Sequence, residues 1–233
     1  MNLHINKKYT YLFFLFSLLI SFYFGEDSSG GSELDYVSSK IFTKVFSDGY
    51  IGGILYFIDN GHDHFPFFYI LISILEKSTN SITVHFLYLL ISSFIPLIFY
   101  NILKKKITYA NKNTLYLLSL ILFFSPYVRS SAVWLTTDNL GIILFGLAIS
   151  KYLSFENKTK NYFKYSLQCF FFLILASYTR QYYAIFFIIF FSLMFQKLRF
   201  RQIIIIIIFN FLVALPALVY IYFYISQNSL LSD

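Results

Sequence analysis

The stretch FPFFYILISILEK, residues 65–77, decides how this chain can be laid across a membrane. Its apolar part, Phe65–Leu75, holds only 11 residues before Glu76 and Lys77. A helix that crosses a bilayer needs about 20 apolar residues, and apolar runs of about 10–14 are more often interfacial or re-entrant. Whether this stretch crosses determines the side on which every later loop lies.

The composition places the chain among integral membrane proteins. It has 233 residues, of which 58% are hydrophobic and 12% charged, whereas a soluble domain carries about 25% charged residues. The apolar residues form long runs, and a chain of this size cannot bury so much apolar surface against itself. The net charge of +7 comes from basic clusters between these runs, which is typical of membrane topology and does not indicate a nucleic-acid partner.

Seven apolar runs are expected to cross the bilayer. The first, Tyr9–Phe24, is interpreted as a retained signal anchor, because two lysines precede it and no cleavage site of small residues follows it. The other six are residues 82–102, 113–130, 139–155, 163–179, 181–196 and 202–225. The expected fold is all-α, a single module over residues 1–233 with about seven transmembrane helices.

The basic residues decide that Phe65–Leu75 does not cross. Without that crossing, ten of the 11 acidic residues, all but Glu156, lie on one side of the membrane. Most basic residues then lie on the other side: Lys7, Lys8, Lys104, Lys105, Lys106, Lys112, Lys151, Lys158, Lys160, Lys164, Lys197, Arg199 and Arg201. Since basic loops stay on the cytoplasmic side, the N-terminus is predicted inside and the C-terminus outside.

The loop after the first span, residues 25–80, is expected to carry juxtamembrane helices on the outer side. Residues 33–46 have helical spacing, and Phe65–Leu75 follows as a second short helix. An apolar face is expected on the first of these, suited to lying on the membrane. Its members are Leu34, Val37, Ile41, Val45 and Phe46.

Polar residues of this loop have a functional and a plain interpretation. Asp35 stands near the start of the 33–46 helix, where the helix dipole favours a negative charge. His62, Asp63 and His64 could ligate a metal ion, or the two histidines could simply be solvated among lipid headgroups. The pattern is too short to assign a metal, so no metal or other cofactor is predicted, although a divalent ion stays possible.

Two short outer turns each carry one arginine, Arg129 and Arg180. A guanidinium there suits the phosphate of a lipid-linked substrate, which it can bind bidentately. The other interpretation is an interfacial anchor beside aromatic residues.

At these residues the chain resembles the GT-C superfamily of membrane glycosyltransferases, and in particular bacterial relatives of protein O-mannosyltransferase and of lipid A aminoarabinose transferase. The likeness rests on four motifs in the same order. These are Glu33-Leu-Asp35-Tyr36, His64-Phe-Pro-Phe-Phe-Tyr69, Ser125-Pro126 leading to Trp134-Leu-Thr-Thr-Asp138, and Thr179-Arg180-Gln181. The motifs extend along nearly the whole chain, which corresponds to the N-terminal module of that superfamily.

The resemblance implies transfer of a sugar from a polyprenyl-phosphate donor to a glycan or lipid acceptor outside a bacterial plasma membrane. It implies Asp35, or else Glu33, as the general base on the acceptor hydroxyl. It also implies that His62, His64, Arg129, Asp138, Arg180 and Gln181 bind substrate, with arginine stabilising the departing phosphate. The alternatives are a transporter or flippase of lipid-linked saccharide, a polysaccharide polymerase or ligase, and a non-catalytic or truncated membrane subunit.

Overall fold

The chain is all-α in the computed structural model, which describes residues 6–62, 65–157 and 161–230. Within those ranges it forms α-helices and two short 3-10 helices without any strand, so the all-α prediction is confirmed. In chain order the elements are α1 (Lys7–Phe24), α2 (Ser32–Asp48), α3 (Tyr50–Asp59), α4 (Phe67–Ser78), α5 (Ser81–Ser92), α6 (Ile95–Lys106), α7 (Lys112–Leu120), η1 (Ile121–Phe124), α8 (Pro126–Trp134), α9 (Thr137–Asn157), α10 (Tyr162–Thr179), η2 (Gln181–Ile185), α11 (Phe186–Phe195) and α12 (Phe200–Leu230).

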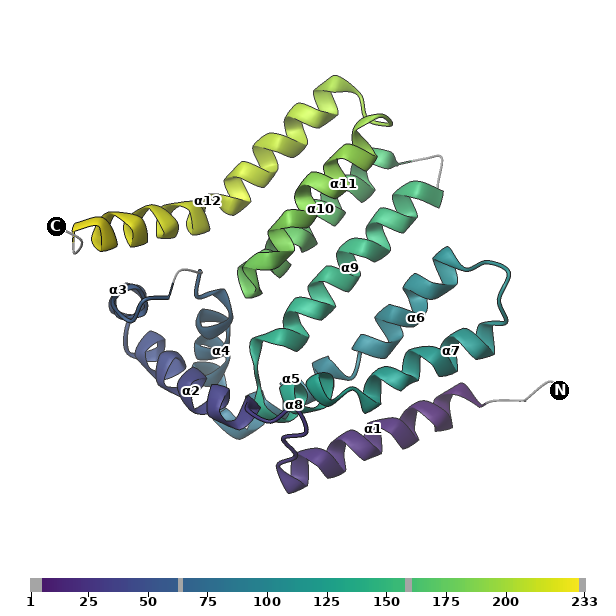
Figure 1. Ribbon diagram of the computed structural model, residues 1–233, viewed down its shortest axis with the longest axis horizontal. Coiled ribbons are helices and arrows are strands. Elements are labelled where there is room, and N and C mark those ends of the chain that lie inside the picture. The colour runs from purple at the N-terminus through teal and green to yellow at the C-terminus, as the bar shows by residue number, and fades with distance from the viewer. Residues whose placement is uncertain (1–5, 63–64, 158–160, 231–233) are drawn as a thin grey trace.

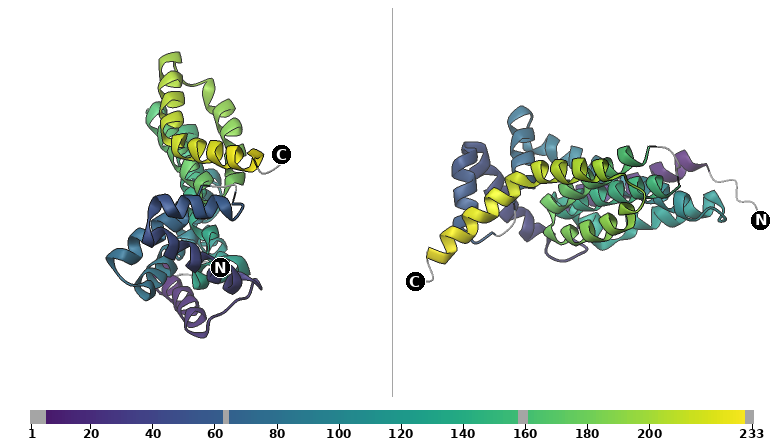
Figure 2. Two further views of the ribbon diagram at one scale, coloured as in Figure 1. Left: turned by 90° about the vertical axis from the view of Figure 1, so that its left-hand side faces the viewer. Right: turned by 90° about the horizontal axis from the view of Figure 1, so that it is seen from above.

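The longer helices lie side by side as a fan of rods (Figure 1). The start of α1, the α6–α7 loop and the α11–α12 turn lie at one end of the rods, which we call the basic end. Helices α2, α3 and α4 gather at the opposite end with the end of α1 and α8, and we call this the loop end (Figure 1). Figure 2 shows the start of α1 and the end of α12 at opposite ends of the long axis. The lysine-rich loops therefore share one end of the molecule.

Two helical segments are long and apolar enough to cross a membrane within the described residues. They are Ser81–Lys106, formed by α5 and α6 with 26 residues, and Phe200–Ser226 in α12 with 27 residues. A third is added if Lys112–Phe124 and Pro126–Trp134, bent by 60°, count as one broken span. Three other rods are not long and apolar enough by the same measure. Helix α1 carries charges at its start, α9 carries charges along its length, and Gln181–Phe195 is short. About seven spans stays a prediction.

Helix α4 is too short to cross a bilayer. Its 12 residues extend about 18 Å at 1.5 Å per residue, against a hydrocarbon core of about 30 Å. It begins just after Pro66 and buries Phe68 and Ile72 in a cluster with Val84 and Tyr88 of α5. The stretch that decides the layout is thus a short helix packed at the loop end (Figure 1).

The apolar face predicted for residues 33–46 is divided in the structure. Phe46 is fully buried, whereas Leu34, Val37 and Ile41 are 75%, 55% and 51% exposed. The buried side of α2 is polar at Ser39 and Thr43 as well, because α3 and α4 pack against it. The exposed apolar residues form a separate stripe that faces away from the protein.

One close approach between the rods depends on a glycine in α9. The core between α9, α10 and α11 contains Phe155, Phe170 and Leu173, all buried. On the other side of α9, a Cβ placed on Gly146 would lie 2.8 Å from Ile98 Cγ2 of α6. Only glycine permits this approach, because the branched Ile98 side chain has little freedom to move within a helix.

We expect Gly146→Ala to destabilise the fold by about 1–3 kcal/mol, as overpacking does in a well-packed core. Thermal unfolding of the detergent-solubilised protein would measure the loss. Gly52→Ala is the matched control, because a Cβ on Gly52 meets nothing within 4 Å and alanine favours a helix. Ile98→Ala in the Gly146→Ala background should restore the α6–α9 approach, and equal melting of the two glycine variants would contradict the packing argument.

Candidate functional site

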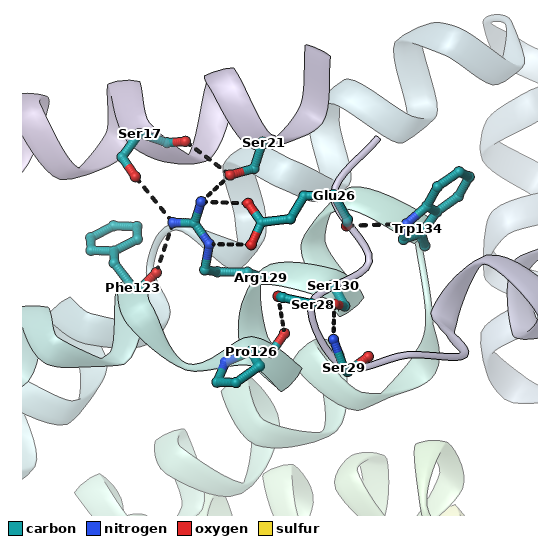
Figure 3. A network of polar contacts seen from close by, with 10 residues as sticks. All are labelled: Ser17, Ser21, Glu26, Ser28, Ser29, Phe123, Pro126, Arg129, Ser130 and Trp134. Carbon is teal, nitrogen blue, oxygen red and sulfur yellow. Dashed lines mark hydrogen bonds and ion pairs between the residues drawn. The ribbon is translucent and has the colours of Figure 1, made fainter. Parts of the chain in front are cut away.

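At the loop end, an ion pair between Glu26 and Arg129 joins the residue after α1 to α8 (Figure 3). Helix α1 ends at Gly25, whose φ of 61° reverses the chain, and the Glu26 amide donates to the Ser21 carbonyl at 3.0 Å. This turn directs the Glu26 carboxylate at α8. Arg129 Nε donates to Oε1 at 3.0 Å and Nη2 donates to Oε2 at 2.6 Å. The two parallel bonds make the pair bidentate and strongly directional.

The other donors of Arg129 are also used. Nη1 donates to Ser17 Oγ at 3.0 Å and to the Phe123 carbonyl at 3.1 Å, and Nη2 donates to Ser21 Oγ as well (Figure 3). A guanidinium has five N–H donors, so all are satisfied within the protein. The side chain is only 14% exposed. Arg129, predicted to bind substrate, therefore has no unused donor for a phosphate in this conformation.

Asp27 caps helix α2. Its Oδ2 accepts from the amides of Gly31 at 2.8 Å and of Glu33 at 3.3 Å. Desolvation opposes ionisation of the carboxyl, but these amide bonds lower the pKa of Asp27 below its ordinary value. The Ser29 amide donates to Ser130 Oγ at 2.9 Å, which ties the same loop to α8. The start of α2 is thus held in place relative to α8.

A second bidentate ion pair joins α9 to α10. Arg180 Nε donates to Asp138 Oδ1 and Nη2 donates to Oδ2, both at 2.9 Å. Asp138 is in the first turn of α9 and Arg180 ends α10, where helix dipoles favour an acid and a base respectively. Unlike the first pair, this one is partly open to solvent, with the arginine 37% and the aspartate 38% exposed. The Nη1 hydrogens of Arg180 have no hydrogen-bond partner among the described residues.

The backbone around this second pair is fixed by close contacts. Leu135, with a φ of 51°, makes the corner between α8 and α9. The Tyr88 hydroxyl donates to the Thr136 carbonyl and accepts from the Leu140 amide at 3.2 Å, so it brackets Asp138. These contacts give the Asp138 carboxylate a defined direction.

Gly141 brings the two helix ends together one turn beyond Asp138. A Cβ at Gly141 would lie 3.0 Å from both Thr179 Oγ1 and Tyr183 Cε2. A larger residue would therefore push α10 and η2 away from α9. Glycine at this position is what lets Arg180 reach Asp138.

Tyr69 of α4 connects this pair to Asp35. Burial raises the pKa of the Tyr69 hydroxyl, on which the charges of Arg180, Asp35 and Asp138 also act. Helix α4 packs against both α2 and α10, which explains why these charges meet around one phenol. The structure thus gathers Asp35, Tyr69, Asp138 and Arg180 at the loop end; we call these four the outer cluster.

Of the predicted site residues, the outer cluster contains three: Asp35, Asp138 and Arg180. Asp35 is exposed in the first turn of α2. Glu33 and Gln181 are exposed nearby in sequence, Glu33 at the start of α2 and Gln181 at the start of η2.

Of the predicted histidines, His62 and His64, the structure describes only His62. The His62 ring stacks on Phe57 at 4.3 Å and contacts Phe42 edge-on at 4.7 Å, and its carbonyl accepts from Tyr220 at 2.5 Å. His62 is therefore packed among aromatic rings. His64 lies outside the described residues.

Sequence reasoning missed Tyr69, Glu26 and Asp27. Tyr69 ends the motif His64-Phe-Pro-Phe-Phe-Tyr69, but the motif gives the tyrosine no role, and its position beside three charges depends on helix packing. Asp27 had a partial signal, since an aspartate followed by Ser28-Ser29-Gly30-Gly31 is typical of a turn, and aspartate side chains accept hydrogen bonds from turn amides. No group of three or more His, Cys, Asp or Glu side chains suited to a metal occurs among the described residues.

Comparisons with models of protein families, with curated proteins and with solved structures find no match to this chain.

The Glu26–Arg129 pair predicts a specific acid sensitivity. The hydrogen bonds from Arg129 lower the pKa of Glu26 from 4.5 to about 2. A lowered pKa means that the pair stabilises the fold fully above pH 4.5 and that this contribution is lost as the pH falls from there towards 2. Glu26→Gln should cost about 1–3 kcal/mol at pH 6 and should flatten the dependence of the melting temperature on pH in this window.

Melting temperatures between pH 6 and pH 3 would test this for wild type, Glu26→Gln and Glu33→Gln. Glu33 is the control because its side chain is exposed at the start of α2. Parallel pH profiles for wild type and Glu26→Gln would show that the pair contributes nothing to acid sensitivity.

Proposed function

We propose that this chain is a membrane glycosyltransferase whose catalytic surface is the outer cluster at the loop end. It transfers a sugar from a polyprenyl-phosphate donor to a glycan or lipid acceptor. The observation that carries the proposal is the arrangement around Tyr69: the charges of Asp35, Asp138 and Arg180 all act on its hydroxyl. Asp35 is exposed, and the partly exposed Arg180 has Nη1 donors that no described residue uses. Such a transfer requires a general base and a cationic side chain that binds the phosphate, both on one surface.

The membrane placement is part of this proposal. About seven rods cross the bilayer, with the basic end in the cytoplasm and the loop end outside, in the plasma membrane of a bacterium. Support comes from the segregation of charges: most of the described lysines and arginines lie at the basic end, where Lys106 pairs with Glu156 at 3.5 Å. A rod that ends in water at both sides can hold its charges at its two ends at little cost.

The proposed chemistry is one displacement. The Asp35 carboxylate takes the proton of the acceptor hydroxyl as the oxygen attacks the anomeric carbon of the sugar. The bond from that carbon to the phosphate oxygen breaks, and the phosphate departs with the electron pair, so the configuration at the anomeric carbon is inverted. Arg180 Nη1, not used by Asp138, neutralises the charge that develops on the phosphate.

Asp35 is preferred to Glu33 as the base. The charge of Asp35 acts on Tyr69 together with those of Asp138 and Arg180, whereas the Glu33 amide belongs to the Asp27 cap of α2. Asp138 is preferred as a positioning residue, because both of its oxygens hold Arg180. Arg129 is left out of the site, since its donors are all used.

Asp35→Asn should abolish transfer while the protein stays folded, because the amide cannot accept the proton of the acceptor. The loss should be about 100-fold or more, the usual contribution of a general base. The measurement is sugar transfer in membranes supplied with labelled polyprenyl-phosphate sugar. Asp48→Asn is the control, since Asp48 is equally exposed at the far end of the same helix. Unchanged transfer by Asp35→Asn would rule out the base assignment, and a loss in Glu33→Gln alone would move it to Glu33.

Cysteine labelling tests the placement of the two ends. In a Cys169→Ser background, cysteines replace two exposed hydroxyl residues, Ser38 of α2 and Thr108 in the α6–α7 loop. An impermeant maleimide added to intact cells should label position 38 at once and position 108 only after the membrane is opened. The reverse pattern would invert the proposed orientation, and labelling of both in intact cells would reject the separation of the two ends.

A further inference from the structure

The basic end of the rods divides into two halves with different surroundings. One half is formed by the end of α6 and the α6–α7 loop. Here Lys105 Nζ donates to the Ser150 carbonyl at 2.8 Å and to Ser154 Oγ at 2.9 Å, and Lys106 pairs with Glu156. Lys105 and Lys106 are therefore used within the protein to join α6 to α9, whereas Lys104 and Lys112 of this half are exposed.

The other half is formed by the start of α10 and the α11–α12 turn. Four exposed cations lie on this stretch of the fold, and none of them forms an ion pair with any described acidic residue. They are Lys164, Lys197, Arg199 and Arg201. A concentration of charge that the protein does not neutralise must be solvated or neutralised from outside.

Aromatic rings hold one of these cations at the meeting point of three segments. Lys197 Nζ lies 5.6 Å from the centre of the Phe155 ring and 5.7 Å from that of Tyr162. The two rings contact each other edge-on at 5.1 Å, so they join the end of α9 to the start of α10. A cation over two ring faces keeps its position at the surface, which favours a repeated contact with one ligand.

We propose that this half of the basic end, the four cations together with Tyr162, binds the headgroup phosphate of an anionic phospholipid. The surface lies where apolar rods end: Phe200 is 77% exposed beside Arg199 and Arg201, so an apolar side chain faces outward next to the charges. A phospholipid has an acyl chain that can contact Phe200 and a phosphate that can bind the arginines. A soluble anion can bind only the arginines. The inference rests on the rods crossing a bilayer and not on sugar transfer.

Arginines adjacent to a lipid phosphate can bind it bidentately. The Arg199 amide donates to Gln202 Oε1 at 3.0 Å, which fixes the start of α12 between the two arginines. Each basic residue near an anionic membrane surface adds about 1 kcal/mol of attraction, so three together change affinity by roughly 100-fold.

The test titrates the detergent-solubilised full chain with short-chain phosphatidylglycerol and, separately, with phosphatidylcholine. Two triple variants remove the same charge: Lys197→Gln with Arg199→Gln and Arg201→Gln, and Lys8→Gln with Lys104→Gln and Lys112→Gln. All six side chains are exposed, so both variants should keep the helical circular dichroism of wild type.

The first triple should weaken phosphatidylglycerol binding by roughly 100-fold and the second by less than about 10-fold, with wild-type binding weakened by salt. A variant that keeps the charge, Lys197→Arg with Arg199→Lys and Arg201→Lys, should keep most of the wild-type affinity for phosphatidylglycerol. Equal losses in the two triples, equal binding of phosphatidylcholine, or displacement of the lipid by millimolar inorganic phosphate would each overturn the proposal.

Discussion

The bidentate pair of Glu26 and Arg129 is the contact on which the arrangement of the loop end depends. It joins the end of α1 to α8, and the Asp27 cap immediately after it positions the start of α2. Because Asp35 is in the first turn of α2, this chain of contacts sets the position of its backbone. Burying an ion pair costs desolvation energy, and here that cost is offset because every donor of Arg129 has an acceptor.

The two arginines of the loop end show how burial separates structure from chemistry. Arg129 is 14% exposed and fully bonded, so it fixes geometry. Arg180 is 37% exposed and donates only Nε and Nη2 hydrogens to Asp138, so its Nη1 can still bind a ligand. From the sequence, each arginine is predicted to be either a phosphate ligand or an interfacial anchor. The difference between them comes from partners about 40 and 100 residues away in the chain, Asp138 and Glu26.

The sequence predicts the segregation of charge and the all-α class, because both follow from local composition and from the cost of moving charge into lipid. The sequence also predicts that Asp35, Asp138 and Arg180 lie at the same end of the rods, because the order of the loops determines the end at which each residue lies. On α2 the sequence places Leu34, Val37 and Ile41 on one face, and the structure leaves these three exposed. The burial of Phe46 could not be predicted, because it depends on the packing of α3 and α4 against this helix. Tyr69 could not be found either, since its role depends on the packing of α4 between α2 and α10.

The single tryptophan of the chain stands beside the Glu26–Arg129 pair. The Trp134 indole Nε1 donates to the Glu26 carbonyl at 3.2 Å (Figure 3). The Trp134 ring also lies 5.8 Å from that of Tyr36. Indole emission depends on nearby polar groups, and no second tryptophan obscures it. The protein therefore carries an intrinsic optical reporter of its loop end, so that opening of the α1–α2 connection can be followed by fluorescence without any attached dye.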